Sequence, residues 1–240
     1  MRETWLLLRH YRRLAGRNWF GLLIGAIQPL LFLALFGPLF VTVGTWETLV
    51  PGLMLQLGLL SAGLCGFGVL FDRQSGVLER LRVTPAGRLP LLLGRVLSDV
   101  TTLLVQTVVL VGAGYAFGLR APLAGVLLSL LVIAVLGTAL AALSYAAALA
   151  LPEELFAPVA TTAVVPLMLL SGTFLPMSMA PGWLDVLSRV TPFRHVLDAV
   201  RDLFAGHYLT GAVATGAAVL AALTALCLAV GVRTFNRANA

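Results

Sequence analysis

The chain contains no lysine, because all sixteen of its basic residues are arginine. A Walker A loop places a lysine on the nucleotide phosphates, and a Schiff base needs a lysine amine. The chain itself can therefore hold neither. Cysteine is also scarce: Cys65 and Cys227 are the two thiols, and both lie within apolar runs. Without a CxxC pair or a histidine beside them, they indicate apolar packing rather than a metal site or a disulfide.

Charge of either sign is scarce as well. Charged residues make up 11% of the chain, against about 25% in typical soluble domains. Hydrophobic residues make up 60%, and the mean hydropathy is +0.99. So few charges cannot cover a water-soluble surface, whereas apolar runs of about 20 residues cross a bilayer as helices. The net charge of +6 comes from arginines that flank these runs, which is typical of membrane proteins and does not indicate nucleic-acid binding.

The hydropathy pattern predicts an all-α membrane protein with six transmembrane helices in one domain, residues 1–240. The predicted spans are residues 18–43, 49–71, 96–119, 123–151, 155–175 and 211–232. Ahead of the first span, Arg2–Leu14 alternates apolar residues with arginine at helical spacing. This pattern predicts an amphipathic helix that lies in the membrane interface.

The distribution of arginine predicts the orientation. With the N-terminus inside, twelve arginines lie in inner segments and four in outer ones. Because inner loops are enriched in arginine and lysine, we expect both termini to be cytoplasmic. The predicted location is the bacterial plasma (inner) membrane, as a multi-pass protein.

The outer segment, residues 176–210, predicts two short amphipathic helices that resemble a re-entrant element. Pro181 and Pro192 stand where helices begin. The apolar faces consist of Trp183, Leu187 and Val190 in the first helix, and of Phe193, Val196, Leu197, Val200 and Phe204 in the second. Arg194, Asp198, Arg201 and Asp202 share the opposite face of the second helix, where they can form ion pairs. The segment fits either an inert cap over the bundle or a lid on an exit path.

Two contacts inside the bundle are also expected. Gly21 and Gly25 form a GxxxG pair that permits close helix packing, which we expect within one subunit, with a seam between two subunits as the alternative. Asp99 lies four residues after Arg95, near the inner face, so the two can form an i,i+4 pair.

The inner loop, residues 72–95, holds a short amphipathic helix. Ser75 can cap it, Val77, Leu78 and Leu81 form an apolar stripe, and Pro85 ends it. Such a short helix is not stable alone. It either lies on the lipid headgroups or docks on another protein.

Two stretches resemble a known family. They are FDRQSGVLERLRVTP with the following LLLGRVLSD, and LLSGTFLPMSMAPGWLDVLSRVTPFRHVLDAVRDLFAG. Both resemble type-2 ABC exporter permeases, of the daunorubicin- and multidrug-resistance type, and the resemblance in order and spacing covers nearly the whole chain.

The resemblance implies a membrane subunit that is not itself an enzyme. It implies a second permease subunit, in a homodimer or a heterodimer, and ABC ATPase subunits beneath. ATP and Mg would be bound by the ATPase, with no cofactor in this chain. The coupling helix would be Gly76–Val83, and its contact residues would be Gly76, Val77, Leu78, Glu79, Arg80 and Leu81. Arg2–Leu14 would be the connecting helix. Gln74 stands where the family usually carries glutamate, so a salt bridge from that position is absent.

The expected function is export of a hydrophobic or amphiphilic substrate, such as a drug, a polyketide or a lipid-like molecule. The spans offer few polar contacts, and the residues we assign to a substrate path are Gln56, Thr161, Thr162 and Phe174. The other expected partner is membrane lipid. The alternative is a membrane scaffold or sensor whose inner loop anchors a cytoplasmic partner without transport.

Overall fold

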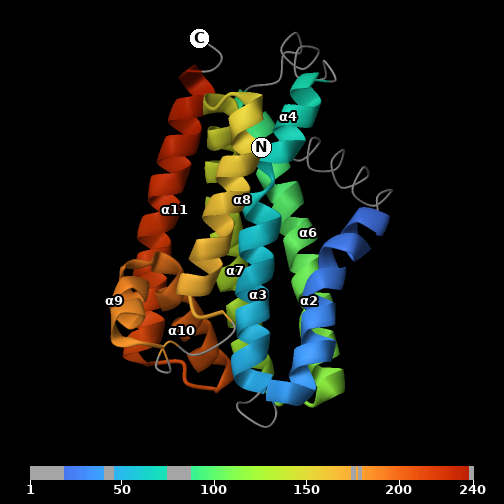
Figure 1. The fold of residues 1–240 in the computed structure, drawn as a ribbon, viewed down its shortest axis with the longest axis vertical. Helices are drawn as coiled ribbons and strands as arrows, with labels where there is room; N and C mark the ends of the chain where they lie inside the picture. Colours follow the sequence, from blue (N-terminus) through green and yellow to red (C-terminus); the bar gives the residue numbers. More distant parts are fainter. Residues whose placement is uncertain (1–18, 41–45, 75–87, 174–176, 178–179, 238–240) are drawn as a thin grey trace.

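The computed structural model describes residues 19–40, 46–74, 88–173, 177 and 180–237. These residues form helices joined by short connections (Figure 1). The helices are α2 (Trp19–Phe40), α3 (Trp46–Gly63), α4 (Gly66–Gln74), α6 (Arg88–Phe117), α7 (Leu123–Ala150), α8 (Glu153–Leu170), α9 (Gly182–Val190), α10 (Pro192–Phe204) and α11 (Gly211–Arg237). The predicted all-α class is confirmed for this part of the chain. The predicted interfacial helix Arg2–Leu14 lies outside the described residues.

Five stretches of the described residues are long and apolar enough to cross a membrane. They are Trp46–Phe71, Leu93–Phe117, Leu123–Ala150, Glu153–Leu170 and Gly211–Thr234. A shorter apolar stretch, Gly25–Pro38, lies in α2, where the first of the six spans was predicted. The multi-span architecture is therefore confirmed, and the count of six stays a prediction.

The structure corrects three predicted boundaries. The second span is interrupted between α3 and α4, at Leu64 and Cys65. The third helix begins at Arg88 instead of residue 96, because its proline, at position 90, falls in the first turn, where a missing N–H costs little. The α8 helix ends at Leu170 instead of residue 175, and Gly172 follows with φ +76°, a conformation that terminates helices and favours glycine.

The α3 helix lies at the centre of the bundle. Every residue from Leu49 to Leu59 is buried, which is expected for a helix that is apolar on all sides. By contrast, only 11% of the α8 span is buried, against 61% of the span Trp46–Phe71. The α8 helix therefore presents most of its surface outward.

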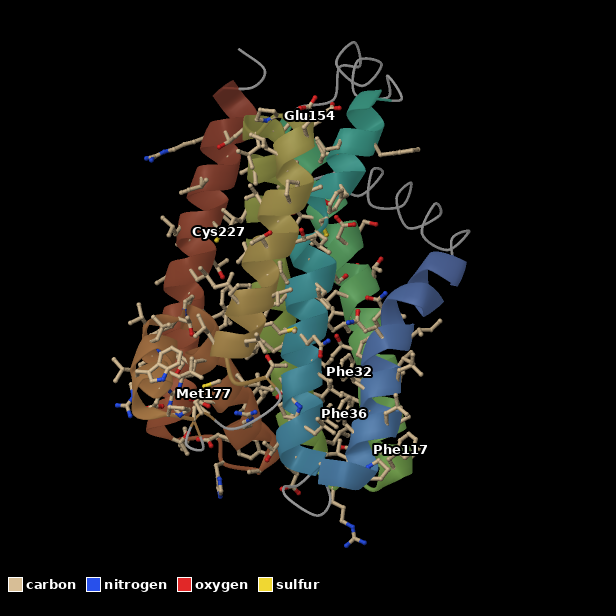
Figure 2. All side chains as sticks on the ribbon, in the orientation of Figure 1. Phe32, Phe36, Phe117, Glu154, Met177 and Cys227 are labelled. Carbon is tan, nitrogen blue, oxygen red and sulfur yellow. The ribbon has the colours of Figure 1, made fainter. Side chains whose placement is uncertain are left out.

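The two ends of the bundle differ. Figure 1 shows the ends of α4 and α11 with the α7–α8 turn at one end, and the end of α2 and the start of α3 with α9 and α10 at the other. At the α9–α10 end, Trp46 stacks on Phe117 with ring centroids 6.0 Å apart. Figure 2 places Glu154 at the opposite end from Phe117, in the first turn of α8, where a carboxylate is stabilised by the helix dipole.

The two outer helices begin at the predicted prolines, since Pro181 precedes α9 and Pro192 is in the first turn of α10. The predicted apolar face of α10 is buried throughout. The α9 helix is arranged in the opposite way: its apolar residues Trp183 and Val190 are exposed, and Ser188 is buried.

Candidate functional site

The interrupted second span is the first candidate site, because backbone groups within a membrane need internal partners. At the interruption, Cys65 N donates to Ala62 O at 3.4 Å and Phe67 N donates to Leu64 O at 3.1 Å. These bonds span three residues instead of the four of a regular α-helix. The helix is therefore tightened and redirected at this point.

A serine from another helix supplies partners at the interruption. The Ser144 hydroxyl of α7 donates to Gly63 O at 2.7 Å, and it accepts a hydrogen bond from Gly66 N at 2.9 Å. One side chain thus bonds the last residue of α3 and the first residue of α4. The sequence reasoning missed this contact. The only signal was the cluster of glycines at 63, 66 and 68 inside an apolar run.

Charged and aromatic groups surround α4 near the same place. The Arg95 guanidinium of α6 lies over the Tyr145 ring, with Cζ 5.4 Å from the centroid, a favourable cation–π geometry. Asp99 lies one helical turn after Arg95 in α6, and its predicted ion pair with Arg95 stays a prediction; the Cys65 thiol donates to Ser61 O at 3.1 Å.

The second candidate site is the ion-pair network that joins α9 to α10. Asp185 of α9 accepts from Arg194 of α10 at 2.6 Å and from Arg189 at 2.7 Å. Arg194 also donates to the Ser188 hydroxyl, and it lies 3.7 Å from Asp198. The polar face of α9 is turned inward because its main ionic partner belongs to α10. The two outer helices are therefore bound to each other.

The pKa values of the two aspartates move in opposite directions. Hydrogen bonds from Arg194 and Arg189 lower the pKa of Asp185, because they stabilise its charged form. Burial raises the pKa of Asp198, and the nearby Arg201 and Arg194 oppose that effect.

The α10 helix is also bound to the end of α8. The Arg201 guanidinium donates to Gly172 O at 2.8 Å and lies 3.9 Å from Asp198. The predicted pairs of Asp198 with Arg194 and Arg201 are thus present. The α10 helix is therefore hydrogen-bonded to Gly172, the residue with positive φ that follows α8.

The residues predicted for the substrate path lie in different surroundings. Gln56 of α3 is buried, with 1% of its surface exposed, and neither of its amide atoms has a hydrogen-bond partner in the described structure. Thr161 and Thr162 of α8 are exposed, and the Thr161 hydroxyl bonds to Ala157 O. The subunit therefore does not bring Gln56 and the two threonines together. Phe174 lies outside the described residues.

The predicted coupling residues, Gly76 to Leu81, also lie outside the described residues. Within the described ranges, no group of three or more histidine, cysteine, aspartate or glutamate side chains is placed to hold a metal ion. The candidate sites therefore consist of the interrupted second span and the ion-paired helices α9 and α10.

Comparison with known proteins decides the family. The family model described as ABC-2 type transporter matches residues 2–205. The chain belongs to the ABC-2 type transporter family. The match contains the first stretch on which the resemblance was based and all of the second except its last residue, Gly206, and it extends over α2 to α10.

Among curated proteins, relatives of this ABC-2 family chain are permeases. The daunorubicin resistance ABC transporter permease protein DrrB1 of Streptomyces coeruleorubidus is 27% identical over 223 residues, which cover 89% of this chain and 79% of the relative. A chain named as a transport permease, ycf38, from Porphyra purpurea is 28% identical over 83% of this chain and 71% of its own. A chain named as a doxorubicin resistance ABC transporter permease, DrrC, from Mycobacterium tuberculosis is 27% identical over 66% of this chain and 58% of its own. This ABC-2 chain is thus a membrane transport permease by family.

Proposed function

We propose that this chain is the membrane subunit of an ATP-driven exporter, and that separate ABC ATPase chains bind and hydrolyse ATP with Mg. The observation that carries this proposal is the family match over residues 2–205, which includes the inner loop 72–95. The proposal is also supported by the relatives named as drug-resistance permeases. The chain has no lysine for a Walker A loop, so the nucleotide is bound elsewhere.

The proposed substrate is hydrophobic or amphiphilic, a drug, a polyketide or a lipid-like molecule. This is supported by the apolar composition of the spans and by two relatives whose names refer to daunorubicin and doxorubicin. Few polar side chains line the described helices, so recognition rests mainly on apolar contact with a small number of polar groups.

Gln56 is the polar group that we assign to the path. It lies on the same face of α3 as Gly52 and Gly63, which approach Thr173 and Val164 respectively. This face is therefore turned toward α8 and the residues that follow it. A buried amide without partners costs about 1–3 kcal/mol. Separation of α8 from α3 would offer this amide to a substrate.

The proposed second permease subunit packs along α8, where it completes the path. This is supported by the small buried share of the α8 span, 11%. Thr161 and Thr162 lie on the exposed side of α8, so they would line a seam between two subunits. A homodimer and a heterodimer both satisfy this arrangement.

The proposed location is the bacterial inner membrane, with both termini cytoplasmic. Twelve inner against four outer arginines support this orientation. It is also supported by the helix directions, since α4 and α11 end together and α9 and α10 lie at the other end (Figure 1).

The coupling assignment is tested with Leu78→Asp and Leu81→Asp. We expect either variant to insert normally but to lose co-purification with the proposed partner ABC ATPase, because a charge disrupts the apolar anchor. Leu209→Asp is the matched control, because Leu209 is fully exposed at the α9–α10 end of the bundle. Normal ATPase association in the Leu78 and Leu81 variants would contradict the coupling role.

Transport itself is tested by reconstituting the complex in liposomes with daunorubicin as the probe. Stimulation of ATP hydrolysis and ATP-dependent movement of the probe support an exporter. ATPase binding without either effect indicates a scaffold or sensor, the alternative function.

The path residue is tested with Gln56→Leu, a substitution of similar volume. We expect higher thermal stability, because two unpartnered amide atoms are removed, together with lower stimulation by daunorubicin. The control is Gln28→Leu, since Gln28 is exposed on α2. A variant in which stability and stimulation both fall would assign Gln56 a structural role only.

A further inference from the structure

The junction between α3 and α4 joins two helices through two residues, Leu64 and Cys65. The interruption at Leu64 and Cys65 contains no side chain larger than leucine and is flanked by Gly63 and Gly66. Glycine leaves the backbone free of a Cβ, which lets the chain change direction at low steric cost. Hinges consist of a few such residues at the ends of rigid elements.

Close packing at Gly66 determines the angle between the two helices. A Cβ added there would overlap the Phe156 ring of α8 and lie 2.6 Å from Ser144 O of α7. The backbone of α4 therefore approaches two other helices directly. Immediately beyond it, the Phe67 ring meets the Phe156 ring edge-on, with centroids 5.1 Å apart.

A third helix contacts α4 one residue further along. A Cβ added at Gly68 would overlap the Arg95 guanidinium of α6. The α4 helix is thus positioned by α7, α8 and α6. It ends at Gln74, directly before the loop that is expected to meet the ATPase.

We infer that the Leu64–Cys65 interruption is a hinge in the second span, and that Ser144 is the positioning residue that holds α4 at its resting angle. The inference rests on the proposed function, because the ATPase supplies the force. Movement of the inner loop turns α4 about the hinge, and the Phe67–Phe156 contact passes that movement to α8. Since the face of α3 that carries Gln56 is turned toward α8 at Val164, these contacts would link ATP use to access to the path.

The key comparison is Ser144→Ala against Ser129→Ala. Both serines are on α7 and both are buried. Ser144 bonds to Gly63 O and Gly66 N, whereas the Ser129 hydroxyl has no hydrogen-bond partner in the described structure. The two variants therefore remove the same atom from the same helix, and only one of them removes the bonds at the hinge.

The measurement is a pair of distances in the complex with the ATPase, in lipid nanodiscs. Spin labels on ketone-bearing phenylalanine at positions 71 and 150 report α4 against α7, since Phe71 and Ala150 are exposed. Labels at Leu143 and Leu226, both exposed, report α7 against α11 as a fixed reference. Pulsed electron paramagnetic resonance is recorded without nucleotide and after trapping with ATP and vanadate.

We expect trapping to change the 71–150 distance and to leave the 143–226 distance unchanged. In Ser144→Ala, we expect a broad 71–150 distribution before nucleotide is added, and at least a fivefold loss of daunorubicin moved per ATP hydrolysed. Ser129→Ala should match the unmodified chain in both readouts. The hinge is refuted if trapping leaves the 71–150 distance unchanged, or if the two serine variants behave alike.

The result also separates the hinge from the proposed function. If the unmodified chain does not bind the ATPase or support ATP-dependent movement of daunorubicin, the proposed function fails. If it does both while the 71–150 distance stays constant, only the hinge fails. As a second variant, Gly66→Ala should fix α4 in a displaced position and uncouple hydrolysis from transport, while Gly112→Ala, which has open space around it, should not.

Discussion

Arg201 and Arg189 offer a test of which polar contacts hold the outer helices in place. Arg189 has the better ion pair, since its Nε and Nη2 lie 3.0 and 2.7 Å from Asp185 Oδ2. Arg201 lies 3.9 Å from its carboxylate and donates a hydrogen bond of 2.8 Å to Gly172 O. By ion-pair distance alone, Arg189 should contribute more to the free energy of unfolding than Arg201. We predict the reverse.

The difference in burial between the two side chains makes Arg201 the larger contributor to stability. The Arg189 side chain is 68% exposed, so water competes for its ion pair and the pair adds little to stability. The Arg201 side chain is 16% exposed, and Gly172 is buried. Replacing Arg201 with glutamine leaves the Gly172 carbonyl without its donor, at a cost of about 1–3 kcal/mol. Since about 1 kcal/mol corresponds to roughly 2–4 °C for a chain of this size, a loss of about 2 kcal/mol lowers Tm by roughly 4–8 °C.

The assay is thermal unfolding of purified Arg201→Gln and Arg189→Gln in the same nanodiscs, followed by circular dichroism. We expect a clear decrease in Tm for Arg201→Gln and no measurable change for Arg189→Gln. Equal shifts, or a larger shift for Arg189→Gln, would refute the argument that burial rather than ion-pair distance determines these contributions.

Two further outcomes are expected. Gly125→Ala should lower the free energy of unfolding by about 1–3 kcal/mol, because the added Cβ would overlap Leu203 O where α7 meets α10. The control is Gly112→Ala, which has open space around it and should lower Tm much less in the same thermal assay. The pKa of Asp185 is lower in the folded chain than in the unfolded chain, so at acidic pH the folded chain binds fewer protons at this residue. The stability that Asp185 contributes is therefore complete above its unfolded pKa, and it is lost as the pH falls through its folded pKa. The probe is the fluorescence of Trp183 in a chain whose other tryptophans are replaced with phenylalanine, and its signal should change on acidification as α9 separates from α10. Asp185→Asn should show the changed signal already at pH 7. A signal that does not depend on pH in either chain would contradict the role of Asp185 in holding α9 on α10.

Much of the helical layout could be predicted from the sequence. The α7 and α11 helices begin where predicted, at Leu123 and Gly211. These starts could be predicted because they are determined by apolar runs and turn residues, which are local features of the sequence. The third span was predicted to begin at residue 96 and its apolar stretch begins at Leu93, but the α6 helix itself already begins at Arg88 in a segment that was predicted as a charged loop. Gly25 lies against the Gln106 side chain of α6 within the subunit, while the close packing predicted for the Gly21–Gly25 pair stays a prediction.

The candidate sites were less predictable, because they depend on residues far apart in the chain. The sequence predicts an amphipathic α9, but only the structure shows that Asp185 binds Arg194 of α10 and that Ser188 is buried while Arg189 stays exposed. Nothing local to Gln56 shows that its amide has no partner. The coupling residues Gly76 to Leu81 were assigned by resemblance alone, and that assignment stays a prediction.

The amino-acid sequence by itself determined that this protein lies in a lipid bilayer, that it is helical, and approximately how long its membrane-spanning helices are. The reason is that transfer of apolar residues into lipid depends on the composition of a short stretch of sequence. Only the tertiary structure decided where the second span bends and what holds that bend. Gly66 and Ser144 are 78 residues apart, and their hydrogen bond exists only after α4 has packed on α7.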